Sequence, residues 1–448
     1  MSGPLRWLRQ LGLLATATVC VATMATASPL PVAAAGGGAG LTPIMGWSSW
    51  SNFRGGVNEQ IVVAQAQAMH ATLQSHGYTY VNIDSGWTDH EDGFGRRVWN
   101  TTKFPSGIPA LASRLHGMGL KLGIYLTPGI NRTDVANNVP VFGTSFHAKD
   151  FADTTANGNT TGNGAARIDL TKPGAHEYVQ SLANLYASWN VDYIKMDFVG
   201  PGGGRVPADN RDEIQAWHQA ILKTGRQIHL ELSNSLSFAN ASVWQQFANG
   251  WRIEGDIECY ACEKGHPNHL PLTSWQKVSL RFADLPRWTP FAGPGGFNDL
   301  DSLEVGAGAG DGLTTAQRQT MVTLWSIAPS PLILGPDLTR LDRFDLGLIT
   351  NDEVIAVNQA GVPASPLATG GTRQVWRSKQ ADGTFVVALF NLSTTGTATV
   401  GVTWSQLGFG RPATVRDLWS HTNLGSMPSG VSASLAPGAS RLVRVTRT

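Results

Sequence analysis

The stretch V-D-Y-I-K-M-D-F, residues 191–198, indicates the fold more clearly than any other part of the chain. It is a short run of apolar, β-branched and aromatic side chains between two helical patterns, which is typical of a buried parallel strand. Asp197 stands at its end, just before the glycine-rich segment 200–204. Because α/β barrels place catalytic groups at the carboxyl ends of their strands, Asp197 is predicted to lie in an active site. The alternative is a buried aspartate that only anchors a loop.

Lys195 lies two residues before Asp197, so a strand presents both side chains on the same face. A cation beside a carboxyl group favours its ionised form, and a carboxylate acts as a nucleophile only when it is ionised. The pair therefore predicts an activated nucleophile at Asp197.

The alternation of strand and helix patterns extends from Leu41 to about residue 360. The predicted strands cover 45–50, 80–84, 120–126, 191–198, 228–232, 251–257, 296–303 and 331–334. Helical spacing of apolar residues is clearest over 58–76, 109–118, 174–189, 211–224 and 315–327. Eight such units predict an α/β fold, a (β/α)8 TIM barrel over residues 41–360. Carboxylates then recur at the carboxyl ends of strands, namely Asp84, Asp197, Asp256 and Asp301. A doubly wound sheet also alternates, but it does not need eight units whose polar ends meet at one opening.

The pattern changes after about Gly361. Short runs rich in valine, threonine and aromatic residues, separated by glycine, aspartate and proline, replace the helical spacing; they cover 373–378, 384–393, 397–404, 414–420 and 441–446. Such runs predict an antiparallel β-sandwich domain over residues 361–448. No cluster of carboxylates accompanies it, so we expect this domain to pack against the barrel rather than to catalyse.

The amino terminus has the features of an export signal. Arg6 and Arg9 precede an apolar segment, 11–24, which is too short for a convincing membrane span, and an A-x-A cleavage motif ends at Ala27. Residues 1–27 are therefore predicted to be a signal peptide, followed by a flexible leader over 28–40, and the protein is expected to be secreted. No later segment is long and apolar enough to predict a transmembrane helix.

The composition limits the classes of partner. The net charge is +1, and no run of like charge predicts binding to nucleic acid or to a membrane surface. The chain has 15 tryptophans and 51 glycines, which suits a carbohydrate site because indoles stack on the apolar faces of sugar rings. Most of these tryptophans must nevertheless be ordinary core residues.

Beyond the signal segment the chain has two cysteines, Cys259 and Cys262, in the motif C-Y-A-C. In an exported protein such a pair is expected to form a disulfide. His266 and His269 follow closely, so a zinc site is the alternative.

Two carboxylates at strand ends near aromatic residues suit glycoside hydrolysis, in which one attacks the anomeric carbon and the other protonates the leaving oxygen. Six motifs then resemble those of glycoside hydrolase family 27, the α-galactosidase or melibiase family, in the family's order. They are T-P-I-M-G-W-S-S-W from Thr42, Y-V-N-I-D-S-G-W from Tyr80, G-L-K-L-G-I-Y from Gly119, Y-I-K-M-D from Tyr193, W-R-I-E-G-D-I from Trp251 and G-G-F-N-D-L-D-S-L-E-V-G from Gly295.

The resemblance implies a role for each matching residue. Asp197 is expected to be the nucleophile and Asp256 the acid/base of a retaining double displacement on a terminal α-galactoside of an oligo- or polysaccharide. The substrate-binding residues implied are Trp47, Asp84, Tyr125, Lys195, Arg252 and Asp301, with Trp47 stacking on the sugar ring. Two carboxylates suffice for this chemistry, so we expect neither a metal nor another cofactor.

The chain departs from the family's motifs at two predicted substrate-binding positions. Ser85 stands where the family has an aspartate that holds the 4-hydroxyl and 6-hydroxyl side of galactose, and Ser233 stands where the family has a glutamate in the pocket. Loss of a charge-assisted hydrogen bond at residue 85 weakens discrimination in favour of galactose. A different sugar is therefore the alternative, as in the family's β-L-arabinopyranosidases and isomalto-dextranase. A non-catalytic sugar-binding protein is a third interpretation, which the presence of both aspartates disfavours.

Overall fold

The computed structural model describes residues 38–155, 164–202, 209–263 and 265–448. The predicted signal peptide and all but the last three residues of the predicted leader lie outside these ranges. The amide of Asn249 donates to the carbonyl of Ala39 at 3.0 Å, and the Gly295 N–H donates to the carbonyl of Gly40 at 2.8 Å. The end of the leader is therefore packed against the barrel. In the described ranges, no helix combines the length and the apolar character that crossing a bilayer requires.

An eight-stranded parallel sheet forms the centre of the described chain. Its strands are β1 (Met45–Ser48), β2 (Tyr80–Ile83), β5 (Lys121–Leu126), β9 (Tyr193–Met196), β10 (His229–Leu232), β11 (Gly250–Arg252), β12 (Phe297–Asp299) and β13 (Leu332–Leu334). Neighbours in the sheet follow the order of the chain, and β13 pairs with β1. A parallel bridge between Leu303 and Leu334 closes the ring. The predicted (β/α)8 barrel is thus confirmed.

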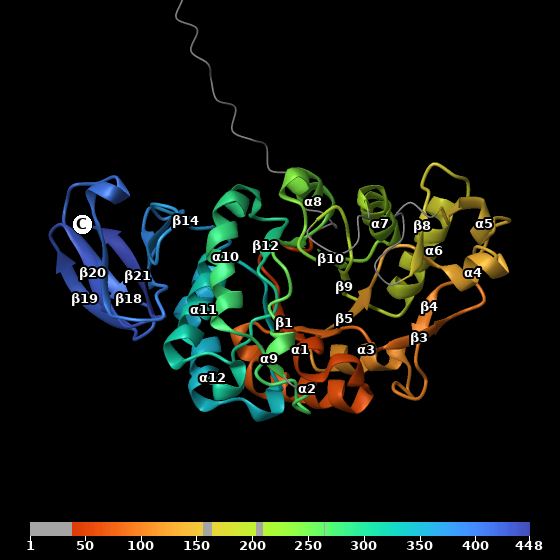
Figure 1. Ribbon diagram of the computed structural model, residues 1–448, viewed down its shortest axis with the longest axis horizontal. Helices are drawn as coiled ribbons and strands as arrows, with labels where there is room; N and C mark the ends of the chain where they lie inside the picture. Colours follow the sequence, from red (N-terminus) through yellow and green to blue (C-terminus); the bar gives the residue numbers. More distant parts are fainter. Residues whose placement is uncertain (1–37, 156–163, 203–208, 264) are drawn as a thin grey trace, which may run out of the picture. The chain divides into compact units, whose positions relative to one another are not determined.

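Helices cover the outside of the barrel (Figure 1). They include α2 (Glu59–Thr72), α3 (Ile108–Gly117), α6 (Ala175–Ser188), α7 (Arg211–Thr224), α8 (Ala241–Phe247), α10 (Trp275–Trp288), α11 (Thr315–Ile327), α12 (Arg343–Ile349) and α13 (Asp352–Gln359). Their ends follow local chemistry: the Asn58 side chain caps α2 by accepting from the Ile61 N–H, and Gly225 ends α7 at φ 72°. The sequence did not predict α8, α10, α12 or α13; α8 has seven residues and α10 contains Pro286.

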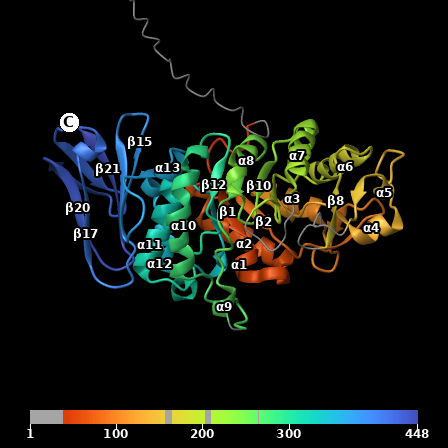
Figure 2. The ribbon, with the colours of Figure 1, turned by 45° about the horizontal axis from the view of Figure 1, so that its top comes forward.

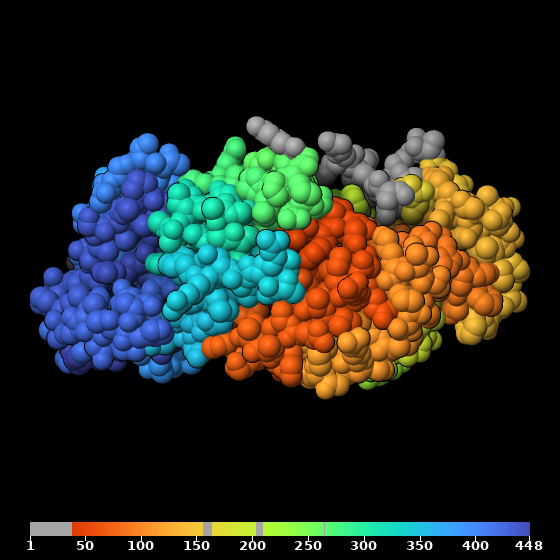
Figure 3. Space-filling view, turned by 90° about the horizontal axis from the view of Figure 1, so that it is seen from below, coloured from red at the N-terminus to blue at the C-terminus, as the bar shows by residue number. Residues whose placement is uncertain are grey.

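The first and last units of the barrel meet at its surface. Figure 3 shows residues near 50–80, in red and orange, directly beside cyan residues near 340. Gln65 of α2 donates to the carboxylate of Asp337 at 2.6 Å and accepts from the Leu338 N–H at 2.7 Å. The ring is therefore closed in its helical layer as well as in its sheet.

Several short elements extend the loops that follow the strands. They are α1 (Trp50–Phe53), the hairpin β3 (Thr88–Glu91) and β4 (Arg97–Trp99), β6 (Ile130–Asn131), α4 (Arg132–Asn137), α5 (Ala148–Phe151), β7 (Ala152–Asp153), β8 (Ala165–Ile168) and α9 (Tyr260–Glu263). Two of them, α1 and α9, lie side by side in both ribbon views (Figures 1 and 2). An ion pair between Arg54, next to α1, and Glu263 of α9 joins them.

The carboxyl-terminal residues form two antiparallel sheets. The larger has the order β14 (Ser365–Pro366), β15 (Arg373–Lys379), β16 (Phe385–Asn391), β21 (Ser440–Arg447), β18 (Ala413–Asp417) and β19 (Thr422–Met427), and the smaller pairs β17 (Ala398–Thr403) with β20 (Gly430–Leu435). Between them lies an apolar core that includes Val387, Val402 and Val443. The predicted β-sandwich is confirmed. The sequence did not predict β19 or β20: β19 has few apolar residues, and the alternation of buried and exposed residues in β20 rests on Val431, Ala433 and Leu435, separated by two serines, and was missed.

The sandwich packs against the barrel through buried contacts. Phe390 of β16 meets Phe282 of α10 edge-to-face with ring centres 4.9 Å apart. The hydroxyl of Thr320 in α11 donates to the carbonyl of Gly438 at 2.7 Å. These contacts extend the barrel's apolar core into one face of the sandwich.

Candidate active site

A cavity of about 440 Å³ opens at the carboxyl ends of the barrel strands. Its wall contains both predicted catalytic residues, Asp197 and Asp256, so the two carboxylates share one opening. Five of the predicted substrate-binding residues also line it: Asp84, Ser85, Tyr125, Lys195 and Arg252. The volume lies within the range of small-molecule sites.

Asp197 follows directly after β9 and is fixed by the neighbouring strand β5. Its backbone N–H donates to the carbonyl of Leu126 at 2.9 Å, and the hydroxyl of Tyr125 donates to its Oδ2 at 3.1 Å. Burial, together with the charges of Asp197 and Asp84, raises the pKa of Tyr125, which keeps this hydroxyl a donor. The buried Oδ1 of Asp197 has no hydrogen-bond partner among the described residues. Such an atom is typical of a site that a ligand completes.

Lys195 lies opposite Tyr125 in the register of β9 and β5, but its direct partner is Asp84. The ammonium group donates to Asp84 Oδ2 at 2.8 Å, while the Ser85 N–H donates to Asp84 Oδ1 at 2.8 Å. Burial alone would lower the pKa of Lys195, but the charges of Asp84, Asp197 and Asp301 outweigh it and raise the pKa. The direct hydrogen-bond partner of Lys195 is therefore Asp84, and its interaction with Asp197 is one of charge.

Asp256 lies in a loop four residues beyond the end of β11, and not at the end of a strand as predicted. Arg252 Nη2 donates to Asp256 Oδ1 at 2.6 Å, and the Tyr260 hydroxyl donates to Oδ2 at 2.9 Å. Lys277 of α10 donates to the Asp256 carbonyl at 2.7 Å. The Asp256 side chain is 39% exposed, so it is open to the cavity although its backbone is anchored.

Asp301 lies behind Arg252, and does not line the cavity as the resemblance implied. It is buried, accepts from Arg252 Nη1 at 3.2 Å and from the Ile257 N–H at 2.8 Å. Burial alone would raise the pKa of Asp301, but the charges of Arg252 and Lys195 lower it to about 2. Its role in this structure is to hold the arginine that holds Asp256.

Trp47 and Ser233 also stand behind the cavity wall. Trp47 lies within β1, is fully buried, and donates its indole N–H to the carbonyl of Pro336 at 2.9 Å. Ser233 follows β10 with its side chain fully buried, and its N–H donates to the carbonyl of Met196 at 2.8 Å. Neither is among the residues that form the wall.

The structure adds wall residues that the sequence did not predict. They are Trp50, Gly86, Thr88, Asp89, His90, Glu91, Arg97, Phe198, Glu258 and Tyr260. Trp50 ends the motif M-G-W-S-S-W and Tyr260 lies between the two cysteines, so each had a signal nearby. The residues of the β3–β4 hairpin had none, because only the folded hairpin brings them to the opening.

Glu258 is a buried carboxyl group beside the acid/base. Its Oε1 accepts from the Ser51 hydroxyl at 2.9 Å. Burial, followed by the negative charges of Asp301 and Asp256, raises the pKa of Glu258 to about 7. These three carboxyl groups offer oxygen atoms within 4.8 Å of one another, which is a spacing suited to a metal ion. Arg252 forms ion pairs with Asp256 and Asp301, so the positive charge that balances these two carboxylates comes from the protein itself.

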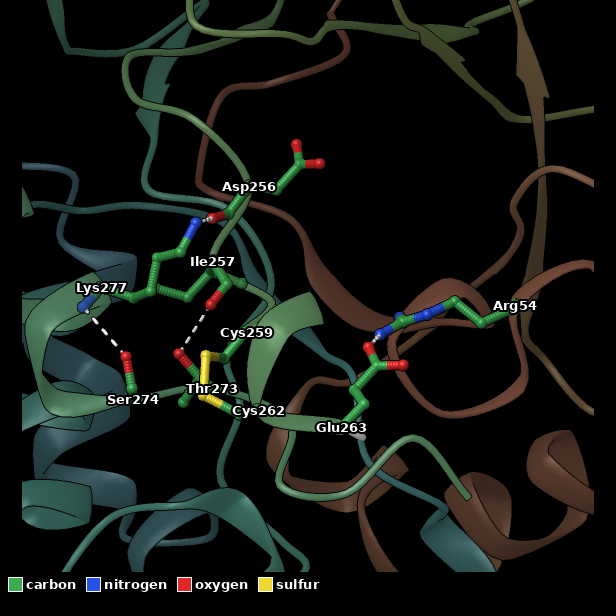
Figure 4. The surroundings of a disulfide bond; sticks show 9 residues. All are labelled: Arg54, Asp256, Ile257, Cys259, Cys262, Glu263, Thr273, Ser274 and Lys277. Carbon is green, nitrogen blue, oxygen red and sulfur yellow. Dashed lines mark hydrogen bonds and ion pairs between the residues drawn. A yellow bond between two sulfur atoms is a disulfide. The ribbon is translucent and has the colours of Figure 1, made fainter. Parts of the chain in front are cut away.

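Cys259, which precedes α9, and Cys262, which lies within it, are joined as a disulfide, and Asp256 is among the residues around it (Figure 4). With their sulfur atoms bonded to each other, they are not available as zinc ligands. Of the two histidines in the alternative zinc motif, His269 is hydrogen-bonded to Glu263 at 2.9 Å.

Comparison with known families agrees with this geometry. The family model described as "Alpha galactosidase A" matches residues 42–160 and 158–360, and the model described as "Alpha galactosidase C-terminal beta sandwich domain" matches residues 370–445. An α-galactosidase from Cyamopsis tetragonoloba is 32% identical over 416 residues, which are 91% of this chain and 87% of that protein.

Two solved structures extend the comparison. A family 27 β-L-arabinopyranosidase from Geobacillus stearothermophilus is 31% identical and superposes with a TM-score of 0.82, covering 91% of this chain and 97% of that one. The α-galactosidase I from Mortierella vinacea is 26% identical with a TM-score of 0.71, covering 92% of this chain and 99% of that one.

Proposed function

We propose that this chain, which belongs to glycoside hydrolase family 27, the melibiase family, is a retaining exo-glycosidase that removes terminal α-galactosyl groups. The observation that carries the proposal is that Asp197 and Asp256 line the same cavity. Asp197 accepts a hydrogen bond from the Tyr125 hydroxyl, and Asp256 accepts one from the Tyr260 hydroxyl. Of the two carboxylates, only Asp256 also accepts from an arginine. The two groups are therefore held separately and in different surroundings, as a nucleophile and an acid/base must be.

In the first step, the Asp197 carboxylate supplies the electron pair for a bond to the anomeric carbon. The bond from that carbon to the leaving oxygen breaks, and the oxygen takes its electron pair together with the proton of Asp256. In the second step, the Asp256 carboxylate removes a proton from water, whose oxygen displaces Asp197 from the anomeric carbon. Two inversions leave the configuration retained, and neither step needs a metal or another cofactor.

A second candidate substrate is a β-L-arabinopyranoside. Ser85 is part of the cavity wall in place of the family's galactose-binding aspartate, and the Geobacillus relative is a β-L-arabinopyranosidase that has also been solved with arabinose. Galactose and arabinopyranose share most of their ring hydroxyls and differ in the group at C5, which is the side that residue 85 is expected to face. A polymer of sugars linked through C6 is a third candidate substrate, as for the family's isomalto-dextranase.

Hydrolysis of 4-nitrophenyl α-D-galactopyranoside, 4-nitrophenyl β-L-arabinopyranoside and dextran tests the proposal. The galactoside is expected to have the highest kcat/KM, and proton NMR is expected to show the retained anomer first. The S85D variant is the matched probe, because it restores the family's charge and should increase the preference for galactoside over arabinopyranoside. A protein that hydrolyses none of these substrates would contradict the proposal, and a higher rate on the arabinopyranoside would favour the second candidate.

The proposal includes export from the cell. It is supported by the predicted signal peptide over residues 1–27, which lies outside the described residues, and by the disulfide between Cys259 and Cys262, which suits an oxidising compartment. Amino-terminal sequencing of protein recovered from the culture medium should begin at Ser28. Recovery of the intact chain from the cytoplasm alone would contradict export.

A further inference from the structure

We propose that Tyr260 is a positioning residue for the acid/base, which places the catalytic proton on Asp256 Oδ2 and stabilises the carboxylate once that proton has left. The inference rests on the proposed function, since it takes Asp256 as the acid/base. The geometry that carries it is a chain of two hydrogen bonds along the cavity wall. The Trp50 indole N–H donates to the Tyr260 oxygen at 2.9 Å, and the Tyr260 hydroxyl donates to Asp256 Oδ2 at 2.9 Å.

The two oxygens of Asp256 have different partners, and this difference decides where a proton can sit. Oδ1 accepts from Arg252 Nη2 at 2.6 Å, and a guanidinium group has donors only. A proton on Oδ1 would neutralise the oxygen that accepts this bond and so weaken a charge-assisted interaction. Oδ2 instead meets a hydroxyl, which can donate or accept as the protonation state of the carboxyl group changes. The catalytic proton thus belongs on Oδ2, next to Tyr260.

The hydroxyl of Tyr260 gains strength as a donor during the reaction. When Asp256 gives its proton to the leaving oxygen, negative charge develops on Oδ2, and the hydrogen bond from Tyr260 becomes charge-assisted. An interaction that is stronger in the transition state than in the ground state lowers the barrier. Burial and the neighbouring charges of Glu258 and Asp256 raise the pKa of Tyr260, so the hydroxyl keeps its own proton throughout.

The Tyr260 ring is held from its far side although it is 45% exposed. The Arg54 guanidinium lies 5.0 Å from the centre of the Tyr260 ring and 5.4 Å from that of Trp50, within the range of cation–π attraction. Arg54 is itself fixed by an ion pair with Glu263 of α9 and by a hydrogen bond of 2.8 Å to the Trp50 carbonyl. The disulfide between Cys259 and Cys262 brackets Tyr260 in the chain (Figure 4). The orientation of Tyr260, the first residue of α9, is thus set by its contacts with Trp50, Asp256 and Arg54.

Leaving-group dependence tests the inference. The preferred glycoside is measured with two leaving groups, methanol, which needs a proton, and 2,4-dinitrophenol, which does not. Tyr260→Phe keeps the ring and removes the hydroxyl. We expect its kcat/KM to fall by about 10- to 100-fold on the methyl glycoside, the loss of one hydrogen bond to a charged group, and by less than about threefold on the dinitrophenyl glycoside.

The pH profile is a readout that a purely structural role would not move. A donor to the ionised carboxylate makes the proton of Asp256 easier to lose, so removal of the hydroxyl should move the alkaline limb of kcat/KM to higher pH. Trp50→Phe removes the donor to the Tyr260 oxygen. It should lower kcat/KM on the methyl glycoside and move the alkaline limb to higher pH, both by less than Tyr260→Phe does. Tyr80→Phe is the matched control, because its hydroxyl accepts from Lys121 at 3.1 Å and the residue is absent from the wall of the cavity.

The Asp256→Ala variant separates the inference from the proposed function. If it loses far more activity on the methyl than on the dinitrophenyl glycoside, Asp256 is the acid/base. Equal losses of the Tyr260→Phe variant on the two substrates, or none, would then overturn the role of Tyr260 alone. An Asp256→Ala variant without leaving-group dependence, or a wild-type protein without turnover, would overturn the proposed function and the inference with it.

Discussion

The two sides of the cavity are built in different ways. The nucleophile side consists of residues at or just beyond the ends of the adjacent strands β2, β5 and β9, where Asp84, Tyr125, Lys195 and Asp197 contact one another across the sheet. The acid/base side consists of a loop after β11 and the short helices α1 and α9, which are joined by Trp50, Arg54 and Tyr260. The first side is positioned by the hydrogen bonds of a parallel sheet, and the second by side chains that meet from segments about 200 residues apart. One site thus combines a nucleophile fixed by the parallel sheet with an acid/base fixed by side-chain contacts between loops and short helices.

Asp197→Ala should show the largest effect, since it removes the group that forms the covalent bond. We expect kcat to fall by about four orders of magnitude or more, with the melting temperature nearly unchanged because the residue faces the cavity. Steady-state kinetics and thermal unfolding measure both. Asp382→Ala, in an exposed turn of the sandwich, is the control and should keep full activity. Ordinary activity of the Asp197→Ala variant would assign the nucleophile elsewhere.

Lys195→Met tests whether the nucleophile side depends on its buried ion pair. The substitution leaves the Asp84 carboxylate buried without its cation, so the free energy of unfolding should fall by about 3–5 kcal/mol. Chemical denaturation followed by tryptophan fluorescence measures this. Lys121→Met, an exposed lysine near the other end of the barrel, should cost less than about 1 kcal/mol. Similar losses for the two variants would mean that the strand-end network is not specially stabilised.

Glu258→Gln addresses the charge behind the acid/base. Glu258 accepts from the Ser51 hydroxyl and interacts electrostatically with several further groups, namely the carboxyl groups of Asp256, Asp301 and Glu304, the cations Lys195 and Arg281, and the Tyr260 hydroxyl. The raised pKa of about 7 means that folding favours protonated Glu258. Protonated Glu258 contributes about 1–3 kcal/mol to the free energy of unfolding of the wild type. This contribution is complete below the unfolded pKa near 4.5 and is lost as the pH rises through 7.

Denaturation of the wild-type and Glu258→Gln proteins at pH 5 and pH 8 measures that difference. The variant should lose less stability over this range than the wild type does, whereas Glu177→Gln, on the exposed face of α6, should behave as the wild type. The alkaline limb of the activity profile should also move to lower pH in the variant, because the negative charge of ionised Glu258 helps Asp256 to keep its proton. Parallel pH curves for all three proteins would rule out this role.

Removal of the disulfide should have the smallest effect. Substituting serine for both Cys259 and Cys262 opens a very short loop, so the unfolding free energy should fall by at most about 2 kcal/mol. Activity on the methyl glycoside should fall about two- to fivefold, because Tyr260 is then held less well against Asp256. Treatment of the wild type with dithiothreitol should reproduce the loss. If activity on the dinitrophenyl glycoside falls by the same factor, the disulfide does not act through proton transfer.

The amino-acid sequence by itself determined the barrel, the sandwich and the residues at the strand ends. Buried parallel strands are continuous apolar runs, and a carboxylate that follows such a run must lie at the carboxyl edge of the sheet. Asp84 and Asp197 could therefore be predicted from local pattern, and the motifs led to Asp256 through a resemblance. The partner of Lys195 could not, because two carboxylates lie within reach of one ammonium group and only the packed geometry selects Asp84.

Only the tertiary structure decided the acid/base side of the cavity and which predicted residues stand behind its wall. Trp47 and Asp301 belong to the matching motifs and Ser233 stands at a pocket position of the family, yet all three are buried and none is part of the cavity wall. Trp50 and Tyr260 carry no periodic signal, because their contact depends on how two loops fold over the barrel. Local patterns record the period of a strand or a helix, whereas a contact between distant loops has no period along the chain. Such a contact can stabilise the protein only after the barrel has folded and brought the two loops together.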